Sequence, residues 1–181
     1  ANTAKADGRA IPILFTSSTQ ATQNNAYGKS KREAELALKL VGRNPQVPVH
    51  VFRLTNVFGK WCRPNYNSVV ATFCHNTVRD LPILVNDRHT ELKLIYIDDV
   101  IERFVQLMDG ALPMVDGDGF ETIQTQYATT VGELADWVRS FRDSRDSLVL
   151  ERVGIGLARA LYATYVSYLP TERFSYALQQ H

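Results

Sequence analysis

The N-terminal part of the chain follows a strand–helix–strand pattern, and this pattern constrains the fold more than any other feature. An apolar run, Ile11 to Phe15, leads into a cluster of hydroxyl residues, Thr16 to Thr19, as expected of a buried parallel strand that ends in a polar loop. Helix-forming residues extend from Tyr27 to Arg43, and β-branched and aromatic residues recur from Val47 to Val57. This order predicts a βαβ unit, and hence an open α/β sheet with helices on its faces.

The remainder of the chain is less regular. We expect helices over residues 67–79, 98–108 and 156–168, and short strands over residues 82–85 and 92–97. Thr130 and Glu133 have the spacing of a capping box, and apolar residues recur at helical spacing after them. The tail from Thr171 to His181 lacks periodicity and is interpreted as a linker.

Doubly wound dinucleotide-binding folds carry a glycine fingerprint after their first strand. None of the ten glycines of this chain is arranged in that way. Two interpretations follow: either the protein does not bind a dinucleotide, or the chain starts after the phosphate-binding turn.

Composition excludes several classes of protein. The 181 residues are 45% hydrophobic and 22% charged, and the net charge is +1, so no bulk field favours nucleic acid or an anionic membrane. Two cysteines without CxxC spacing indicate a reduced, cytoplasmic setting. Four histidines without ligand spacing predict no metal site.

Tyr27 and Lys31 are the residues with the clearest chemical meaning. They are four positions apart at the start of the first helix, so their side chains share one face. A nearby ammonium favours the phenolate and makes a tyrosine useful as a general acid or base. Ser18, at the end of the preceding strand, could orient a substrate oxygen. The alternative is a Tyr–Lys pair that has arisen by chance on a solvated helix face.

The motifs resemble those of a known family. Ser-Ser, then Tyr-x-x-x-Lys, then the R-x-x-N-V-F-G motif of residues 53–59, and later Ile-Asp-Asp-Val, are similar to the extended short-chain dehydrogenase/reductases of nucleotide-sugar metabolism. The resemblance implies a catalytic triad of Ser18, Tyr27 and Lys31, with Tyr27 as general acid/base. It also implies cofactor contacts from Ser17, Tyr27, Lys31, Asn56 and Val57.

Three longer segments, including G-K-W-C-R-P-N-Y-N and Y-L-P-T-E-R-F-S-Y, are similar to the bacterial capsular-polysaccharide reductases that act on a UDP-2-acetamido-2,6-dideoxy-4-keto-hexose. The resemblance implies NADP(H), with NAD(H) possible, a UDP-sugar substrate, and a homodimer at full length. Substrate contacts are expected from Thr19, Arg63, Asn65, Asn67 and Arg88. The alternatives are an ordinary polar loop for residues 61–67, a helix cap for Asn67 and a surface turn for Arg88. The adjacent Asp98 and Asp99 are interpreted as residues that cap the helix or brace the sheet, and the alternative is a pair of catalytic carboxylates.

By the same resemblance, the chain is the C-terminal part of a Rossmann-type doubly wound parallel sheet plus a small mixed α/β substrate-binding subdomain. Residues 1–60 would form the second half of the NAD(P)-binding domain with the catalytic triad. Residues 61–169 would form mainly the substrate-binding subdomain, with segments that return to the Rossmann domain. Residues 170–181 would lead toward a C-terminal cupin domain, which makes the chain an internal fragment.

Two other functions remain open. A nucleotide-sugar 4-epimerase or 4,6-dehydratase with bound NAD would share the triad. Dehydratases add acidic residues after the triad serine, where this chain has Thr19 and Gln20. A non-catalytic dinucleotide-binding scaffold or sensor would have no need of all three triad groups.

Overall fold

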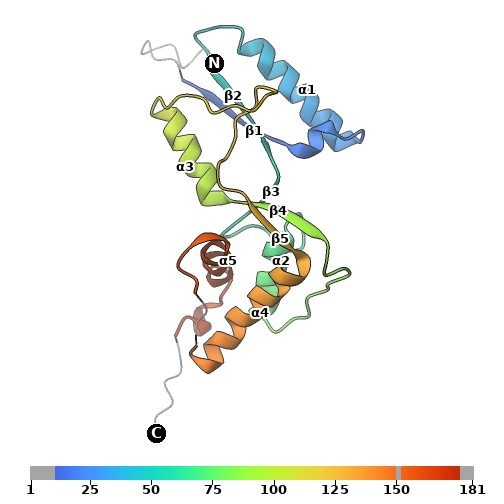
Figure 1. Ribbon diagram of the computed structural model, residues 1–181, viewed down its shortest axis with the longest axis vertical. Helices are drawn as coiled ribbons and strands as arrows, with labels where there is room; N and C mark the ends of the chain where they lie inside the picture. The colour runs from blue at the N-terminus through green and yellow to red at the C-terminus, as the bar shows by residue number, and fades with distance from the viewer. Residues whose placement is uncertain (1–10, 150–151, 176–181) are drawn as a thin grey trace. The chain divides into compact units, whose positions relative to one another are not determined.

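The computed structural model describes residues 11–149 and 152–175. The chain divides into two compact units, which are described separately (Figure 1). The first comprises residues 1–55 and 99–125, and the second comprises residues 56–98 and 126–181. None of the helices within the described ranges has the length and apolar character needed to cross a bilayer.

The first unit is built on a parallel strand pair. Strands β1 (Ile13–Ser18) and β2 (Val49–Leu54) pair in parallel, with Ser18 opposite Leu54, and helix α1 (Ala26–Val41) connects them. Most of helix α3 (Ile97–Met108) belongs to this unit as well. The predicted βαβ unit and α/β fold class are therefore confirmed.

Successive residues of β2 face opposite sides of the sheet, as the pleat of a strand requires. Arg53 reaches Glu35 on α1, whereas its neighbour Phe52 packs against Phe104 of α3 with 4.9 Å between ring centroids. The two helices therefore cover opposite faces of the strand pair (Figure 1).

A segment around Glu121 extends this sheet, because its N–H donates to the carbonyl of Val51 at 2.8 Å. The buried Glu121 carboxylate lies 2.8 Å from Nδ1 of His50 and accepts from Arg103 at 3.0 Å and from the N–H of Met114 at 3.1 Å. Burial alone would raise the pKa of Glu121, but these hydrogen bonds outweigh it, so the pKa lies below its ordinary value. The carboxylate thus ties β2 to α3 and to the following loop.

The second unit has a mixed three-stranded sheet. Strand β4 (Glu91–Tyr96) lies in the centre, parallel to β3 (Asn56–Phe58) and antiparallel to β5 (Tyr127–Thr130). The apolar stretch expected as one strand through Val57 is therefore divided. Its first part joins the sheet of the first unit, and its last part joins this sheet.

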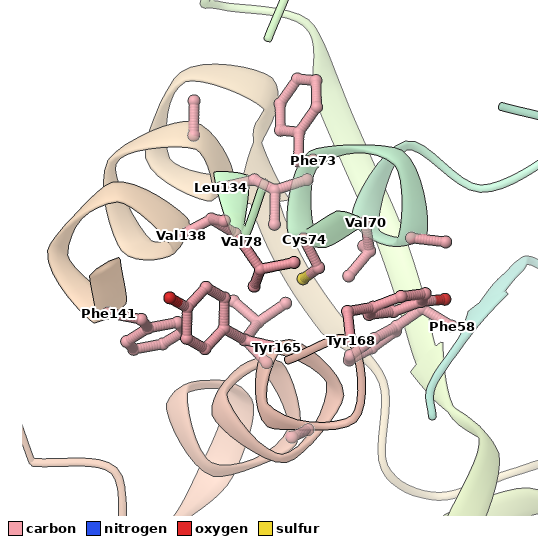
Figure 2. Packing of buried hydrophobic residues seen from close by; sticks show 14 of the residues in the cluster. Phe58, Val70, Phe73, Cys74, Val78, Leu134, Val138, Phe141, Tyr165 and Tyr168 are labelled. Atoms are coloured by element: carbon pink, nitrogen blue, oxygen red, sulfur yellow. The ribbon is translucent and has the colours of Figure 1, made fainter. Parts of the chain in front are cut away.

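Three helices, α2 (Val69–Thr77), α4 (Val131–Ser147) and α5 (Gly156–Val166), enclose the core of the second unit (Figure 2). The core is rich in aromatic rings. Phe141 of α4 lies 5.8 Å from Tyr165 of α5, centroid to centroid. Cys74 is fully buried in this cluster, and burial raises the pKa of its thiol.

One expectation for the second unit is wrong. Residues 82–85 form no strand; instead the side chain of Asn76 donates to the carbonyl of Pro82. The tail, which is expected to be a linker, begins with a 3₁₀ turn, Thr171–Arg173. Arg173 in this turn pairs with Asp80 at 2.7 Å, which anchors the turn to the second unit. Residues 176–181 lie outside the described residues.

Candidate active site

Ser18 is the last residue of β1, and its side chain caps the first turn of the loop that follows. Its hydroxyl oxygen accepts a hydrogen bond from the N–H of Gln20 at 3.2 Å, which caps the short 3₁₀ helix η2 (Thr19–Thr22). The sequence predicts that the strand leads at Phe15 into a loop of hydroxyl residues, Thr16 to Thr19. In the structure β1 continues to Ser18, so most of this hydroxyl cluster lies within the strand. Thr19, expected to contact substrate, is exposed directly after it.

Tyr27 and Lys31 lie on the same side of the first turns of α1. The Lys31 Nζ atom is 5.7 Å from the centroid of the Tyr27 ring and donates to the carbonyl of Thr16 at 3.1 Å. The Tyr27 side chain is half exposed (51%), so it is open to a ligand. The structure therefore brings the phenol and the ammonium together beside the end of β1.

The start of α1 is fixed against the preceding loop. The side chain of Asn25 caps the helix by accepting from the N–H of Gly28 at 2.7 Å. A Cβ atom at Gly28 would lie 2.5 Å from the carbonyl oxygens of Gln20 and Gln23, so only glycine permits this approach. The guanidinium of Arg32 donates to the Gln23 carbonyl of the same loop at 2.8 Å. Tyr27 therefore projects from a well-anchored turn.

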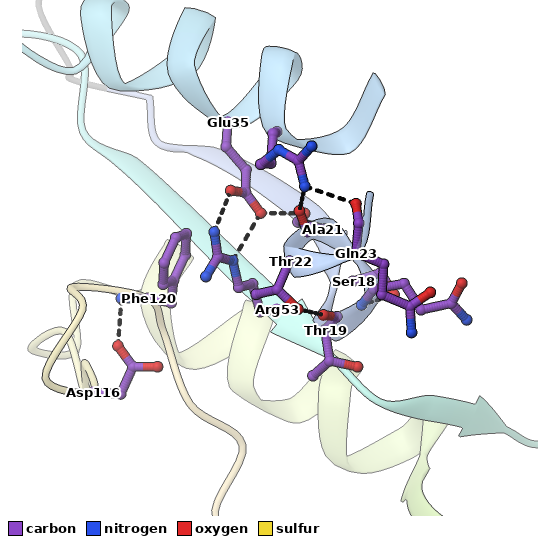
Figure 3. A network of polar contacts seen from close by, with 12 residues as sticks. Ser18, Thr19, Ala21, Thr22, Gln23, Glu35, Arg53, Asp116 and Phe120 are labelled. Carbon is purple, nitrogen blue, oxygen red and sulfur yellow. Dashed lines mark hydrogen bonds and ion pairs between the residues drawn. The ribbon is translucent and has the colours of Figure 1, made fainter. Parts of the chain in front are cut away.

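A largely buried ionic network links α1, β1 and β2 (Figure 3). Glu35, in α1, accepts from Nε of Arg53 at 3.0 Å and from Nη2 of Arg53 at 2.7 Å, and it also accepts from the hydroxyl of Ser17. Burial alone would raise the pKa of Glu35, but the hydrogen bonds from Arg53 and Ser17 outweigh it and lower the pKa below its usual value. The Ser17 hydroxyl donates to Glu35, and its expected contact with the cofactor stays a prediction.

The other face of Arg53 is covered by an aromatic ring. Its guanidinium carbon lies 3.8 Å from the centroid of Phe120, and the ammonium of Lys39 lies 4.7 Å from the same centroid. The loop carrying Phe120 is itself held, since Asp116 accepts from the Phe120 N–H at 2.9 Å (Figure 3). A guanidinium held in a carboxylate fork and stacked on a ring has little freedom.

Asn56 and Val57 are both in β3, in the second unit. Asn56 faces Leu94 and Val57 faces Ile95 in the ladder with β4, and the side-chain amide of Asn56 donates to the carbonyl of Lys93 at 3.3 Å. Their expected contacts with a nicotinamide stay predictions.

The loop after β3 displays aromatic and polar side chains. Trp61 is 81% exposed, with a positive φ of 60°, and the guanidinium of Arg63 lies 5.4 Å from the Tyr66 ring centroid. Asn65 also has a positive φ, of 54°, and its N–H donates to Thr72. Positive φ at a non-glycine residue costs free energy, and the loop contains two of the four such residues in the described part of the chain, which makes it a functional candidate.

The other expected substrate residues have defined surroundings. Asn67 is exposed and is not the helix cap, because the side chain of Ser68 accepts from the N–H of Ala71 in that role. Arg88 pairs with Asp136 at 2.6 Å, an arrangement that suits a surface turn, and its contact with substrate stays a prediction.

Asp98 braces the second unit, as expected, through a 3.0 Å hydrogen bond from the ammonium of Lys60. Gly59 directly precedes Lys60, and a Cβ atom at this position would lie 2.1 Å from the Cγ2 atom of Ile97, so a glycine is needed there.

Glu35 and Arg53 were not predicted as site residues. The sequence indicates Arg53 only as the first residue of the R-x-x-N-V-F-G motif. Glu35 was hidden because a glutamate in a helix usually faces water. One signal was available: Glu35 is four residues beyond Lys31, so it continues the stripe of α1 that carries Tyr27 and Lys31.

A parallel α/β sheet whose strand end meets a Tyr-x-x-x-Lys helix is the arrangement of the short-chain dehydrogenase/reductase class. The model of the NAD dependent epimerase/dehydratase family matches residues 3–117. The chain belongs to this family.

The relatives are more specific. The chain is 52% identical over 177 residues to a UDP-2-acetamido-2,6-beta-L-arabino-hexul-4-ose reductase of Pseudomonas aeruginosa, a match that covers 98% of the chain and 47% of the relative. The crystal structure of the capsular polysaccharide assembling protein CapF from Staphylococcus aureus is also similar, with a TM-score of 0.86 and 40% identity. That match covers 94% of the chain and 46% of CapF. The chain therefore spans about half the length of these relatives.

A more distant structure confirms the Rossmann-type fold alone. The UDP-glucose 4-epimerase of Thermus thermophilus, in complex with NAD, matches with a TM-score of 0.64 at 16% identity, over 87% of the chain and 64% of that protein.

Proposed function

We propose that the chain is the catalytic segment of a reductase that transfers hydride from NADPH to C4 of a UDP-4-keto-6-deoxy-N-acetylhexosamine, in the synthesis of a capsule or surface-polysaccharide precursor. The observation that carries the proposal is the Tyr27–Lys31 pair, in which Lys31 donates to the Thr16 carbonyl of β1, the strand that ends at Ser18. The high identity to a 4-ketose reductase over almost the whole chain supports the choice of substrate.

The triad supplies the proton and stabilises charge. Tyr27, whose phenol is exposed, donates its proton to the alkoxide oxygen that develops at C4. Ser18 donates a hydrogen bond to the same oxygen, and the positive charge of Lys31 stabilises the phenolate that remains on Tyr27. The nicotinamide, when bound, supplies the hydride.

The donors of Lys31 suit a dinucleotide. An ammonium has three N–H groups, and in the described part of the chain the Thr16 carbonyl takes one of them. Two remain to bind ribose hydroxyls of the cofactor. The family supports a nicotinamide dinucleotide, and NADPH rather than NADH is part of the proposal.

The exposed loop after β3 supports a sugar-nucleotide site. Arg63, Asn65 and Asn67 offer planar donors, and Trp61 offers a flat ring, which is the mixture that sugars and diphosphates bind. Thr19 and Arg88 complete the proposed set of substrate contacts.

The complete protein is proposed to work in the cytoplasm as a homodimer. Leu36 and Leu40 of α1 are 62% and 59% exposed, and burying such side chains against a second copy would be favourable.

Replacing Tyr27 by Phe in the complete protein tests the reaction. We expect the turnover number for NADPH oxidation with the 4-keto sugar to fall by at least about 100-fold, because the proton donor is lost. The affinity for the UDP-sugar, measured by calorimetry, should change little. A Tyr27→Phe variant with near-normal turnover would contradict the assignment.

A 4-epimerase is the second candidate, since one of the structures similar in fold is a UDP-glucose 4-epimerase with NAD. A reductase consumes one NADPH for each sugar converted, whereas an epimerase regenerates its cofactor. The stoichiometry of NADPH oxidation against product, measured in one reaction, separates the two.

A further inference from the structure

Glu35 connects three elements that meet behind the triad. It belongs to α1, it accepts from the hydroxyl of Ser17 at the end of β1, and it holds Arg53 at the end of β2 in a two-bond fork. Glu35 is only 3% exposed, so a substrate does not reach it. Any effect of Glu35 on catalysis therefore acts through the residues it holds.

The spacing of residues along α1 shows how the helix is held against β1. Tyr27, Lys31 and Glu35 follow one another at intervals of four and form one stripe of α1. Lys31 binds the carbonyl of Thr16, and Glu35 binds the hydroxyl of Ser17. Two consecutive residues of the strand are thus held by two consecutive turns of the helix.

This double attachment fixes the relative placement of two catalytic groups. Ser18 is the next residue of the strand, and Tyr27 is the next residue along the stripe in the N-terminal direction. If α1 rotated about its axis or slid along β1, both attachments would break. Arg53 of the neighbouring strand β2 also holds the carboxylate of Glu35, so a movement of α1 would break this ion pair as well.

We propose that Glu35 is a positioning residue that sets the geometry of Tyr27 against Ser18 for proton transfer. The inference rests on the proposed function, in which these two groups act on one substrate oxygen. Proximity catalysis depends on such placement, and a shift of about 1 Å can cost about 100-fold in rate.

The test compares Glu35→Gln with Glu33→Gln in the complete reductase. Glu33 is on the same helix but exposed, so its replacement changes charge equally without touching the network. Glutamine retains the shape of Glu35 but loses the charge-assisted fork to Arg53. We expect kcat of the Glu35→Gln variant to fall about 10- to 100-fold. The KM values for NADPH and the 4-keto sugar should stay within about threefold of the wild type, since no contact to either ligand is removed.

A single-turnover measurement separates positioning from simple loss of folded protein. Enzyme is used in saturating excess over NADPH, with saturating sugar, so that NADPH is the limiting reactant. Partial unfolding then leaves the rate constant of NADPH oxidation unchanged as long as folded enzyme stays in saturating excess, whereas misplacement of Tyr27 lowers that rate constant. The proposal requires the rate constant to fall. An unchanged rate constant, or a rise in KM at unchanged kcat, would overturn it.

Ser17→Ala provides a second variant in case Glu35→Gln fails to fold. It removes one hydroxyl and leaves the Glu35–Arg53 pair intact, and the single-turnover rate constant should again fall, by less than in Glu35→Gln. A Ser17→Ala rate equal to that of the wild type would overturn the proposal. If the wild type itself fails to oxidise NADPH with the 4-keto sugar, the proposed function is wrong and the role of Glu35 falls with it. An active wild type with unaffected variants contradicts the role of Glu35 alone.

Discussion

Gly28 lies where the backbone of the preceding loop closely approaches helix α1. The carbonyl oxygens of Gln20 and Gln23 would each be 2.5 Å from a Cβ atom at this position. An alanine in a helix is normally favoured over glycine by about 0.5–1 kcal/mol. At Gly28 the clash is with backbone atoms, which cannot rotate away, and overpacking of this kind costs about 1–3 kcal/mol.

We therefore expect Gly28→Ala to lower the free energy of unfolding, as measured by urea denaturation. Lys29→Ala is the matched control, because Lys29 is exposed on the next position of the same helix and should have little effect. A Gly28→Ala variant as stable as the wild type would show that the loop can move aside.

At the same scale, the placement of Tyr27 and Lys31 on one helix face could be predicted from the sequence, whereas the buried contacts of Glu35 could not. Tyr27 and Lys31 were recognisable because their spacing alone places them on one helix face. Glu35 was not, since its burial depends on Arg53, which is 18 residues away on another strand. The spacing of residues in the sequence predicts which side chains are neighbours on one helix or strand. The burial of a charged side chain depends instead on oppositely charged partners that lie on other elements.

Helix α4 shows what can be predicted of an element from its own residues. The capping box expected at Thr130 and Glu133 is present, with the Thr130 hydroxyl accepting from the Glu133 N–H at 3.1 Å and the Glu133 carboxylate accepting from the Thr130 N–H at 3.1 Å. All these atoms lie within one turn, so the sequence contains the whole motif.

Replacing Thr130 by Ala should reduce stability by about 0.5–2 kcal/mol, the usual cost of losing an N-cap. Thermal unfolding followed by circular dichroism measures the loss. Thr130→Ser retains the hydroxyl and should stay close to the wild type. Equal losses in both variants would mean that the methyl group of Thr130, rather than its hydrogen bond, stabilises the helix.

Elements that depend on distant partners were harder to predict. Residues 82–85 are as apolar as a short strand, yet they have no strand beside them and are held by Asn76 instead. Strand β5 was not expected, because its four residues become a strand only by pairing with β4.

For the whole molecule, the two buried carboxylates of the first unit predict how stability depends on pH. Glu35 and Glu121 both have a pKa lowered below the ordinary value of 4.5. The folded state therefore binds these protons more weakly than the unfolded state. The stability they contribute is complete above about pH 4.5 and is lost as the pH falls through the lowered values.

Glu121→Gln tests this dependence. Near neutral pH it should be clearly less stable than the wild type, because it leaves the buried Arg103 without its counter-charge. The difference should narrow as the pH falls below about 4.5, since the wild type then loses the same charge. Urea denaturation at several pH values provides the measurement. A difference that stays constant with pH would contradict the role of the carboxylate charge.

The division of the chain into two alternating units affects how the protein is made. The first unit needs residues 99–125, which follow the first part of the second unit on the chain. His50 and Glu121, which meet in its core, are 71 positions apart. At a synthesis rate of about 5–20 residues per second, His50 leaves the ribosome about 4–14 seconds before its partner. During translation, the segment that carries Ser18 therefore leaves the ribosome seconds before the residues that complete its unit.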